Sequence, residues 1–451
     1  MTNENNENRT MLTDLYQLTM NAAYMDSNKN DWAVFDLFIR KLPKDWGFFI
    51  ANGIDDALDY ATNIKFEKED LEFLAENCQF TNKYIETLKK FRFTGDIYAV
   101  KEGTPVGANT PLMRIHAPRS EGQYLETMLL NSVNFDTMIA TKANRIVRAA
   151  GDSGVIDMGL RRAQGKDAAM RGARAAYIAG AIGTSNVMAG KEFEIPIFGT
   201  QAHSFVMTYP TELEAFRAYV RTFPNKPTLL VDTYDTIQGI NNAIIVGKEM
   251  ESRGEKLGGI RLDSGDIARD SIIAREKLNS ANLDYVRVVA SNDLNEYKIS
   301  GMINSGARVD GYGVGTEMIT SKPVAAIPGV YKLVEDGTGA KIKLAPGKQT
   351  HPGVKQVYRC YNGAGTISHD VLALEEEQVI GTPLLEKVVE NGSRIIPRRT
   401  LHAIREYCHD EVLSMPEQTK RLSAEQYEVK VSGGLANLES ELRQRYGGRA
   451  A

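Results

Sequence analysis

Six short apolar runs between residues 150 and 330 constrain the fold of this chain more than any other feature. They cover residues 155–158, 195–198, 228–231, 259–262, 286–290 and 310–314. Stretches of helical pattern lie between them, and 235–254, 266–279 and 294–305 each begin near Asp or Asn, as capped helices do. Strands that alternate with helices predict βα units and a parallel sheet.

Periodicity alone leaves the shape of this sheet open. A full eight-stranded α/β barrel takes about 250 residues, which is more than this array offers. An incomplete barrel and an open doubly wound sheet both fit the pattern.

The flanking sequence predicts further parts of the molecule. Residues 33–39 and 96–100 are strand-like, 120–150 indicate one long helix, and a helix-prone tail begins near 397. Antiparallel strands are expected at 330–334, 341–344 and 356–360. We therefore expect a disordered lead-in (1–10), an α+β N-terminal domain (11–120), the region that carries the active site (121–330), and a C-terminal region (331–451) that packs back on the N-terminal domain.

Composition restricts the partners of the chain. A net charge of −4 and a pI near 6 give no extended basic surface for nucleic acid, and no apolar run is long enough for a membrane span. The three cysteines, Cys78, Cys360 and Cys408, lie far apart without a CxxC motif, which argues against a disulfide framework or a zinc site. We expect a cytoplasmic protein with small-molecule substrates and neither nucleic-acid nor membrane partners.

Functional side chains follow every one of the six apolar runs. In chain order they are Arg161 and Arg162, Thr200 and His203, Asp232 and Asp235, Asp263 and Asp266, Ser291 to Asp293, and Gly313, Gly315, Thr316 and Glu317. The carboxyl ends of parallel strands meet at one edge of a sheet, so these residues predict one convergent site.

Several of these residues suit an anionic, phosphorylated ligand. Arg161, Arg162 and Arg261 offer planar guanidinium groups that bind carboxylate or phosphate, and the glycine loop at 313–316 brings backbone N–H groups near a phosphate. Asp263 suits a ribose hydroxyl or Mg²⁺, whereas Asp266 fits equally well as the N-cap of the next helix.

His203 has three chemical readings. It fits a proton shuttle, a nucleophile or a structural histidine. Its place beside Thr200, with Asp232 at the next strand end, favours a functional role in which the Asp232 carboxylate fixes the imidazole tautomer.

Seven stretches of the chain resemble the nicotinate phosphoribosyltransferases, a family of type II phosphoribosyltransferases. They come in family order and are LTDLYQLTM (12–20), DMGLRRAQG (157–165), GTSNV (183–187), GTQAHS (199–204), VDTYD (231–235), RLDSGD (261–266) and YGVGT (312–316). The resemblance implies an irregular incomplete α/β barrel of about six to seven parallel strands, beside an α+β N-terminal domain and a C-terminal extension.

The resemblance also implies a reaction. Nicotinate and 5-phosphoribosyl 1-diphosphate would give nicotinate mononucleotide and diphosphate in NAD salvage, with Mg²⁺ accompanying the diphosphate substrate. ATP would be a co-substrate, hydrolysed through a transient phosphohistidine at His203.

An aldolase, the alternative barrel enzyme, needs a Schiff-base lysine at a strand end, and none stands there. A catalytically silent homologue that binds the nucleotide without turnover is the other alternative.

Individual roles follow from the same resemblance. Tyr16, Thr200 and Arg261 would contact nicotinate, with Tyr16 reaching the site from a neighbouring subunit of a homodimer. The residues expected on the phosphoribosyl group and its phosphates are Arg161, Asp263, Gly313, Gly315 and Thr316.

Ser185 separates nicotinate from nicotinamide as the expected substrate. The similar nicotinamide enzymes carry an Asp where this chain has Ser185, and a carboxylate there would accept from an amide but repel a nicotinate carboxylate. Nicotinamide phosphoribosyltransferase is therefore the second choice. Met158 stands where the nicotinamide-specific relatives have an aromatic residue that stacks on the pyridine ring.

Overall fold

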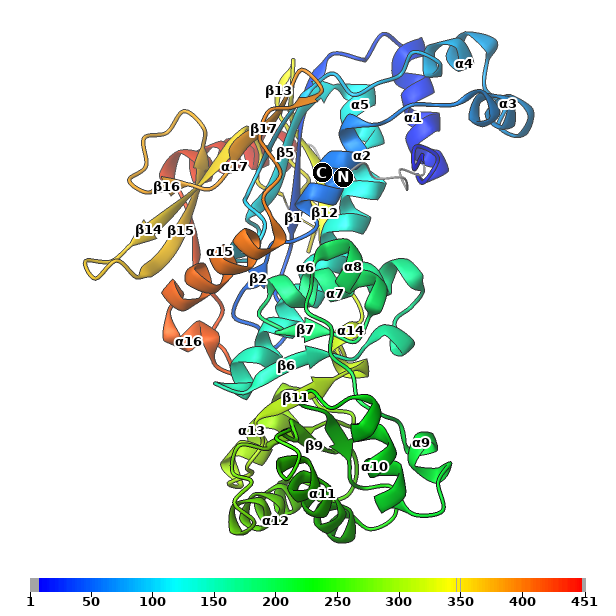
Figure 1. The fold of residues 1–451 in the computed structure, drawn as a ribbon. Helices are drawn as coiled ribbons and strands as arrows, with labels where there is room; N and C mark the ends of the chain where they lie inside the picture. The colour runs from blue at the N-terminus through cyan, green and yellow to red at the C-terminus, as the bar shows by residue number, and fades with distance from the viewer. Residues whose placement is uncertain (1–7, 346, 349, 448–451) are drawn as a thin grey trace. The chain divides into compact units, whose positions relative to one another are not determined.

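The chain folds into two compact units (Figure 1). The computed structural model describes residues 8–345, 347–348 and 350–447. The first unit comprises residues 1–138 and 326–451, and the second comprises residues 139–325. The division falls inside the long helix α6 (Glu126–Ala150).

Residues 121–138, which we expected in the active-site region, belong to the first unit. The side chains of this part of α6 explain the difference. Ser132 donates a hydrogen bond to Asp56, and Thr137 bonds to the backbone of Asn52. These contacts fasten the first half of α6 to the first unit.

The expected lead-in divides into two parts. Residues 1–7 lie outside the described residues. Residues 8–10 are not a disordered segment as expected, because Arg9 forms an ion pair with Asp56 at 2.8 Å and the hydroxyl of Tyr124 donates to the Thr10 carbonyl.

The first unit is built on a seven-stranded sheet with the order β13-β12-β1-β5-β3-β17-β18, in which every neighbouring pair is antiparallel. Its strands are β1 (Trp32–Ile39), β3 (Asp96–Ala99), β5 (Pro111–Pro118), β12 (Gly329–Asp336), β13 (Gly339–Ala340), β17 (Glu386–Glu390) and β18 (Ser393–Arg394). Three strands from the N-terminal part of the chain therefore form the centre of this sheet, and two strands from the C-terminal part flank them at each edge.

Two smaller sheets complete the β-structure of the first unit. Antiparallel β2 (Phe49–Ile50) and β4 (Pro105–Val106) form one, and β16-β14-β15-β19 is the order of the other. The strands of the latter are β14 (Lys355–Tyr361), β15 (Ile367–Leu374), β16 (Thr382–Pro383) and β19 (Val429–Val431). The strand expected at 341–344 is absent, since these residues form no regular element and only the N–H of Lys341 continues the pairing with Val334.

Helices of the first unit come from both ends of the chain. They are α1 (Leu15–Asp26), α2 (Ile54–Thr62), α3 (Lys68–Asn77), α4 (Asn82–Leu88), α5 (Arg119–Tyr124), α15 (Leu401–Ser414), α16 (Glu417–Lys420) and α17 (Gly433–Gly447). Helix α5 packs on β1 so closely that a Cβ at Gly122 would overlap the ring of Phe35. Glycine at this position therefore lets the helix approach the sheet.

The second unit holds an open, six-stranded parallel sheet with the order β7-β6-β11-β10-β9-β8. Its strands are β6 (Gly154–Asp157), β7 (Gly183–Thr184), β8 (Thr228–Leu230), β9 (Gly259–Leu262), β10 (Arg287–Ala290) and β11 (Gly311–Val314). Apolar side chains such as Leu229, Ile260 and Val288 are fully buried, as expected where helices cover a parallel sheet. The fold is α/β, and its sheet does not close into a barrel within the described residues.

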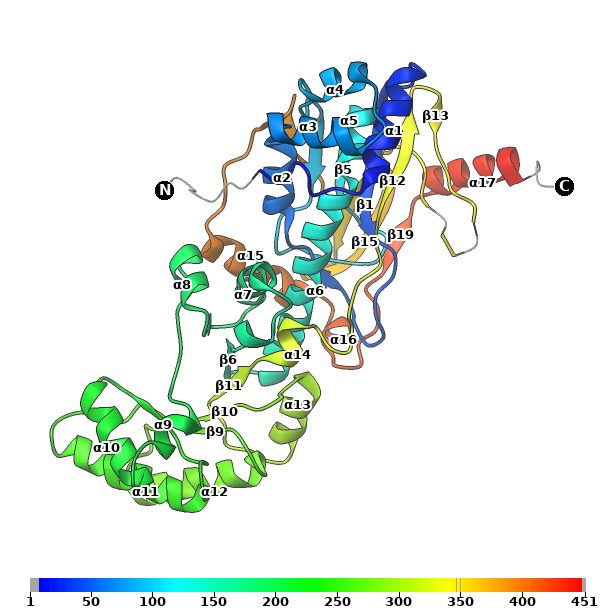
Figure 2. The same cartoon turned by 90° about the vertical axis from the view of Figure 1, so that its right-hand side faces the viewer.

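Short helices connect these strands (Figure 2). They are η1 (Leu160–Arg162), α7 (Lys166–Ile178), α8 (Val187–Phe193), α9 (His203–Met207), α10 (Glu212–Thr222), α11 (Thr236–Glu251), α12 (Ile267–Ser280), α13 (Glu296–Asn304) and α14 (Thr316–Ile319). Asp235, Asp266 and Asn295 cap α11, α12 and α13 by accepting backbone N–H groups. The capping alternative for Asp266 is thus confirmed.

One of the six expected strands was wrong. Residues 195–198 make only a single bridge, between Ile197 and Thr184, because Pro196 has no N–H to donate to a ladder. The sixth strand is instead β7, which is two residues long and begins with glycine, so hydrophobic periodicity gives no sign of it.

No helix among the described residues has the length and apolarity that crossing a bilayer requires.

Candidate functional site

The carboxyl ends of the parallel strands bring His203 together with two neighbouring loops. His203 is the first residue of α9, and 38% of its side chain is exposed. Its Nδ1 lies 3.2 Å from Oγ1 of Thr233, and its Nε2 lies 3.7 Å from Oδ2 of Asp263. The first distance allows a hydrogen bond, whereas the second is too long for one.

Asp232 does not make the expected hydrogen bond to His203. Its Oδ2 accepts from the backbone N–H of Asp263 and from Oγ of Ser264, both at 2.7 Å. The parallel pairing of β8 with β9 explains this placement, since it sets Asp232 beside the loop that follows β9. Asp232 therefore holds the loop that carries Asp263, and Thr233 takes the place beside the imidazole.

Arg261 and Thr200 lie in direct contact. Nη1 of Arg261 donates to Oγ1 of Thr200 at 2.6 Å, and Nη2 donates to the carbonyl of Gln201 at 3.2 Å. Burial lowers the pKa of Arg261, although the nearby carboxylates of Asp263 and Asp232 act in the opposite direction. A guanidinium remains charged in spite of such a shift, so this corner of the site is cationic and suits a carboxylate ligand.

A carboxylate, Asp157, and an arginine, Arg161, lie at the end of β6 and just after it. The Asp157 side chain is buried, and it accepts from Thr184 Oγ1 at 2.7 Å and from the N–H of Gly159 at 2.9 Å. Burial raises the pKa of Asp157. These two hydrogen bonds of Asp157 hold the turn that leads to η1. Arg161 on η1 is exposed, and its positive charge is close enough to Arg261 to lower the pKa of Arg261.

Gly313 within β11 and Gly315 just after it have a packing reason that the sequence does not show. A Cβ at Gly313 would lie 2.5 Å from Sδ of Met158, and one at Gly315 would lie 3.0 Å from the Met158 carbonyl. Met158 also donates its N–H to the Val314 carbonyl. The two glycines thus admit Met158, and Thr316 opens the short helix α14 beside them.

The loop after β10 carries unusual backbone geometry. Asn292 and Asp293 both have positive φ, at 94° and 42°. Ser291, just before them, is buried and donates a hydrogen bond to Oδ1 of Asp263. Consecutive left-handed residues of this kind concentrate at ligand sites, where the surrounding structure supports the strain.

Tyr16 is the one expected site residue outside the second unit. It lies on α1 in the first unit and is 45% exposed. Burial, followed by the nearby Glu126 carboxylate, raises the pKa of its hydroxyl to about 12. At neutral pH this hydroxyl is therefore a donor.

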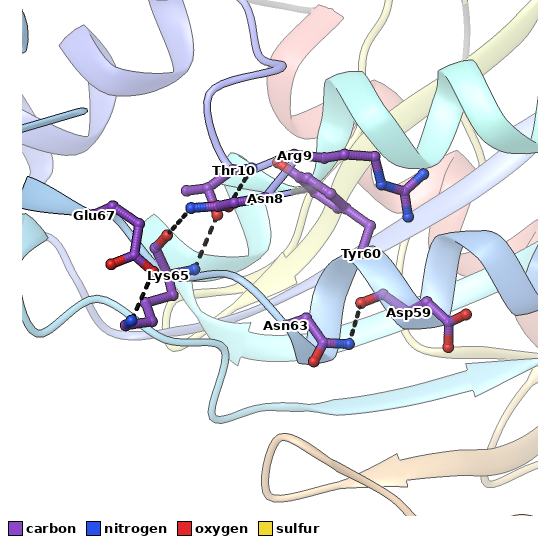
Figure 3. Close-up of a pocket in the computed structure, with 8 residues that line it drawn as sticks. All are labelled: Asn8, Arg9, Thr10, Asp59, Tyr60, Asn63, Lys65 and Glu67. Atoms are coloured by element: carbon purple, nitrogen blue, oxygen red, sulfur yellow. Dashed lines mark hydrogen bonds and ion pairs between the residues drawn. The ribbon is translucent and has the colours of Figure 1, made fainter. Parts of the chain in front are cut away.

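A pocket of about 140 Å³ lies in the first unit and contains none of the expected site residues (Figure 3). It is lined by Asn8, Arg9, Thr10, Asp59, Tyr60, Asn63, Lys65 and Glu67. The charges around it are paired: Arg9 with Asp56, Lys65 with Glu67, and Asp59 with Arg398. Such a balanced lining offers an anionic ligand little attraction, so the loops of the second unit are the better candidate site.

Two contact residues of the site received no role from the sequence, namely Thr233 and Ser264. Both lie in stretches that resemble the family, and each is adjacent to a residue that the sequence assigns to the site, Asp232 or Asp263. Asp232 and Thr233 lie in the loop beyond Leu230, the last residue of β8, where the alternation of strand side chains does not apply. The sequence therefore held no signal that separates Thr233 from Asp232.

Three family models cover most of the chain. The N-terminal domain of nicotinate phosphoribosyltransferase matches residues 11–134, the nicotinate phosphoribosyltransferase family model matches residues 154–324, and the C-terminal domain of the same enzyme matches residues 379–439. The last match includes much of the region to which the sequence assigned no chemistry.

Curated relatives agree along nearly their full lengths. A nicotinate phosphoribosyltransferase of Mycobacterium tuberculosis is 38% identical over 96% of this chain and 94% of its own. That of Bacillus subtilis is 40% identical over 93% of this chain and 92% of its own.

Solved structures share the fold. The crystal structure of human nicotinic acid phosphoribosyltransferase has a TM-score of 0.85 and 27% identity, covering 95% of this chain and 99% of that one. The nicotinate-nucleotide pyrophosphorylase of Pyrococcus furiosus has a TM-score of 0.74 at 23% identity, and it supports the fold alone.

Proposed function

The chain belongs to the nicotinate phosphoribosyltransferase family and is an enzyme of that activity. We propose that it couples phosphoribosyl transfer to ATP hydrolysis through His203. The observation that supports this most is the setting of His203, whose two ring nitrogens face Thr233 and Asp263 beside the cationic Arg261 corner.

The transfer itself is a displacement at the anomeric carbon. The pyridine nitrogen lone pair of nicotinate forms the new C–N bond, the bond from the anomeric carbon to the diphosphate oxygen breaks, and diphosphate leaves with the electron pair. Arg261 and Thr200 would bind the nicotinate carboxylate, and Asp263 with Arg161 would bind the ribose and phosphates. Most of the catalysis is then positioning and charge stabilisation.

The glycine loop would receive the phosphoribosyl phosphate. Met158 fills the space beside Gly313 and Gly315, so Thr316, whose hydroxyl stands at the first residue of α14, is the side chain here that would reach the phosphate. Small residues and free N–H groups are what a phosphate needs at close range.

ATP would act through the imidazole of His203. A ring nitrogen attacks the γ-phosphorus, the bond between that phosphorus and the β,γ-bridging oxygen breaks, and ADP leaves with the electron pair. Water later hydrolyses the phosphohistidine and releases phosphate. A dianionic phosphoryl group beside Asp263 and Arg261 would change the affinity of the site for substrates and products.

Magnesium would enter with the diphosphate substrate. Among the described residues no cluster of three or more His, Cys, Asp or Glu side chains is placed to hold a metal. Asp263 is the carboxylate that fits, with diphosphate and water oxygens completing the set that Mg²⁺ prefers. The ion would neutralise negative charge on the leaving diphosphate.

Nicotinate rather than nicotinamide fits the end of β7. Ser185 is half-buried there and adds no negative charge near the pyridine-binding corner, whereas a carboxylate would repel nicotinate. Competition between the two pyridines in one assay would test this preference.

We also propose a homodimer in the cytoplasm, with Tyr16 of one subunit completing the site of the other. Its protonated hydroxyl suits a carboxylate ligand. For the sheet we propose an incomplete barrel, because β6, the first parallel strand along the chain, pairs with β11, the last of them.

A nicotinate mononucleotide assay with and without ATP tests the function. Purified enzyme is incubated with nicotinate, phosphoribosyl diphosphate and Mg²⁺, and product is measured for wild type and His203→Ala. We expect the variant to lose ATP stimulation but to keep some ATP-independent transfer. Normal ATP stimulation in His203→Ala would rule out the phosphohistidine, and absence of product in the wild type under every condition would indicate a silent homologue.

A further inference from the structure

We propose that Thr233 is the positioning residue for His203, the role that sequence reasoning gave to Asp232. Its hydroxyl fixes the rotation of the imidazole and makes the two ring nitrogens chemically unequal. This inference rests on the proposed phosphohistidine function and names the residue that prepares the histidine for it.

The contacts of the ring carry the proposal. Among the described residues, the hydrogen bond recorded for the imidazole is the one between Nδ1 and Oγ1 of Thr233, at 3.2 Å. Asp263 lies 3.7 Å from Nε2, beyond hydrogen-bond range. A charge at that distance attracts or repels but does not set the orientation of a ring.

The alternative, Asp232, is committed elsewhere. Its Oδ2 already accepts two hydrogen bonds, from Asp263 N–H and Ser264 Oγ, and the residue is only 9% exposed. Its Oδ1 is buried and makes no hydrogen bond to the imidazole within the described residues. Asp232 thus supports the loop, and the task of orienting His203 falls to its neighbour.

A hydroxyl suits this task because it donates or accepts. When Oγ1 of Thr233 accepts from Nδ1–H, the lone pair of the neutral ring is at Nε2, and when it donates, the lone pair is at Nδ1. The first arrangement is the one that prepares the ring, because it leaves the Nε2 lone pair free and directed to the site; in the second the Nδ1 lone pair is occupied and Nε2 carries the proton. Without the hydroxyl the half-exposed ring rotates freely, and the lone pair spends less time in the direction of an incoming phosphorus.

Phosphoenzyme labelling separates this role from a purely structural one. The intact enzyme is incubated with γ-³²P-ATP and Mg²⁺, and the initial rate of base-stable, acid-labile labelling is measured for wild type, Thr233→Val and Thr233→Ser. Thr222→Val is the matched control, since Thr222 is an exposed threonine on α10 whose hydroxyl bonds only within its helix. ATP-independent transfer is measured in parallel.

We expect Thr233→Val to label about tenfold more slowly, the effect of losing one hydrogen bond, while Thr233→Ser stays within about threefold of wild type. The loss in labelling should exceed the loss in ATP-independent transfer, and Thr222→Val should label at the wild-type rate.

Labelling of Thr233→Val at the wild-type rate would overturn the inference, and so would a Thr233→Ser variant as slow as Thr233→Val. Thr233→Ala removes the same hydroxyl without adding a methyl group. If both variants lose labelling and ATP-independent transfer equally, the residue supports the whole pocket and the positioning role is wrong. Absence of label in the wild type, or equal label in His203→Ala, instead defeats the proposed phosphohistidine.

Discussion

Arg261 combines burial with a fixed orientation. Its two terminal nitrogens donate hydrogen bonds to Thr200 and to the Gln201 carbonyl, while its Nε is buried and makes no hydrogen bond within the described residues. An unsatisfied buried donor costs about 1–3 kcal/mol, so it is retained where a ligand makes use of it. The cationic corner is therefore prepared before any carboxylate arrives.

Arg261→Ala should weaken nicotinate binding most. We expect the KM for nicotinate to rise at least about tenfold, because a charge-assisted hydrogen bond of roughly 1.5–3 kcal/mol is lost. Steady-state kinetics with nicotinate varied at saturating phosphoribosyl diphosphate measure this. Arg217→Ala on α10 is the control, since that arginine pairs with Glu249. An unchanged nicotinate KM in Arg261→Ala would remove it from the pocket.

Residue types could be predicted from the sequence better than their pairings. Thr200 and Arg261 were assigned to one pocket and do lie in contact. The partner of His203 was assigned to Asp232 because a carboxylate is the usual choice, and the structure places Thr233 there. Both residues lie in the loop that follows β8, and composition carries no information about which of two neighbouring loop side chains faces the imidazole.

At the scale of elements, the hairpin of β12 and β13 ends in a charged junction. Asp336 pairs with Arg119 at the start of α5 and with Lys341, both at 2.8 Å, and Thr338 donates to it from both backbone and side chain. Burial raises the pKa of Asp336, but Lys341 and Thr338 outweigh burial and lower the pKa to about 2.

Asp336→Asn should therefore destabilise the protein in a pH-dependent way. A depressed pKa stabilises the fold above the unfolded value of about 4, and this contribution is lost as the pH falls toward about 2. We expect about 1–3 kcal/mol less unfolding free energy at pH 7. Urea unfolding between pH 7 and pH 3 should show the gap from wild type narrowing below about pH 4. Asp152→Asn, at an exposed turn residue, should show no such gap.

Elements with strong periodicity could be predicted, and short ones could not. Helices α11, α12 and α13 were expected from their Asp and Asn caps and are found there. The expected strand at 195–198 was wrong because Pro196 interrupts pairing, and β7 was missed because two residues carry no period. The strand expected at 341–344 was also wrong, since β13 ends the hairpin earlier. Whether a neighbouring strand was available for pairing, rather than apolar character, determined which of these segments form strands.

At the scale of the whole molecule, the expected site residues divide between the two units. Thr200, His203 and Arg261 belong to the second unit, and Tyr16 belongs to the first. In a homodimer with a shared site, Tyr16 of one subunit would act with Arg261 of the other. A C2 interface would then build two equivalent sites.

Mixed dimers test the shared site. Tyr16→Ala and Arg261→Ala are each expected to bind nicotinate weakly, because each removes one contact from every site. Unfolding and refolding an equal mixture should restore about a quarter of wild-type activity at low nicotinate, since half of the dimers then hold one intact site of two. Activity of the mixture equal to the mean of the two variants would show that each site is built from one subunit.

The sheet of the first unit also has a consequence for synthesis on the ribosome. Strand β1 has β5 on one side and β12 on the other, but β12 begins only at Gly329, after the entire second unit. At translation rates of roughly 5–20 residues per second, one edge of β1 waits on the order of tens of seconds for its partner. An unpaired edge of that kind can pair with other chains, so we expect the nascent protein to be most prone to aggregation until β12 has emerged.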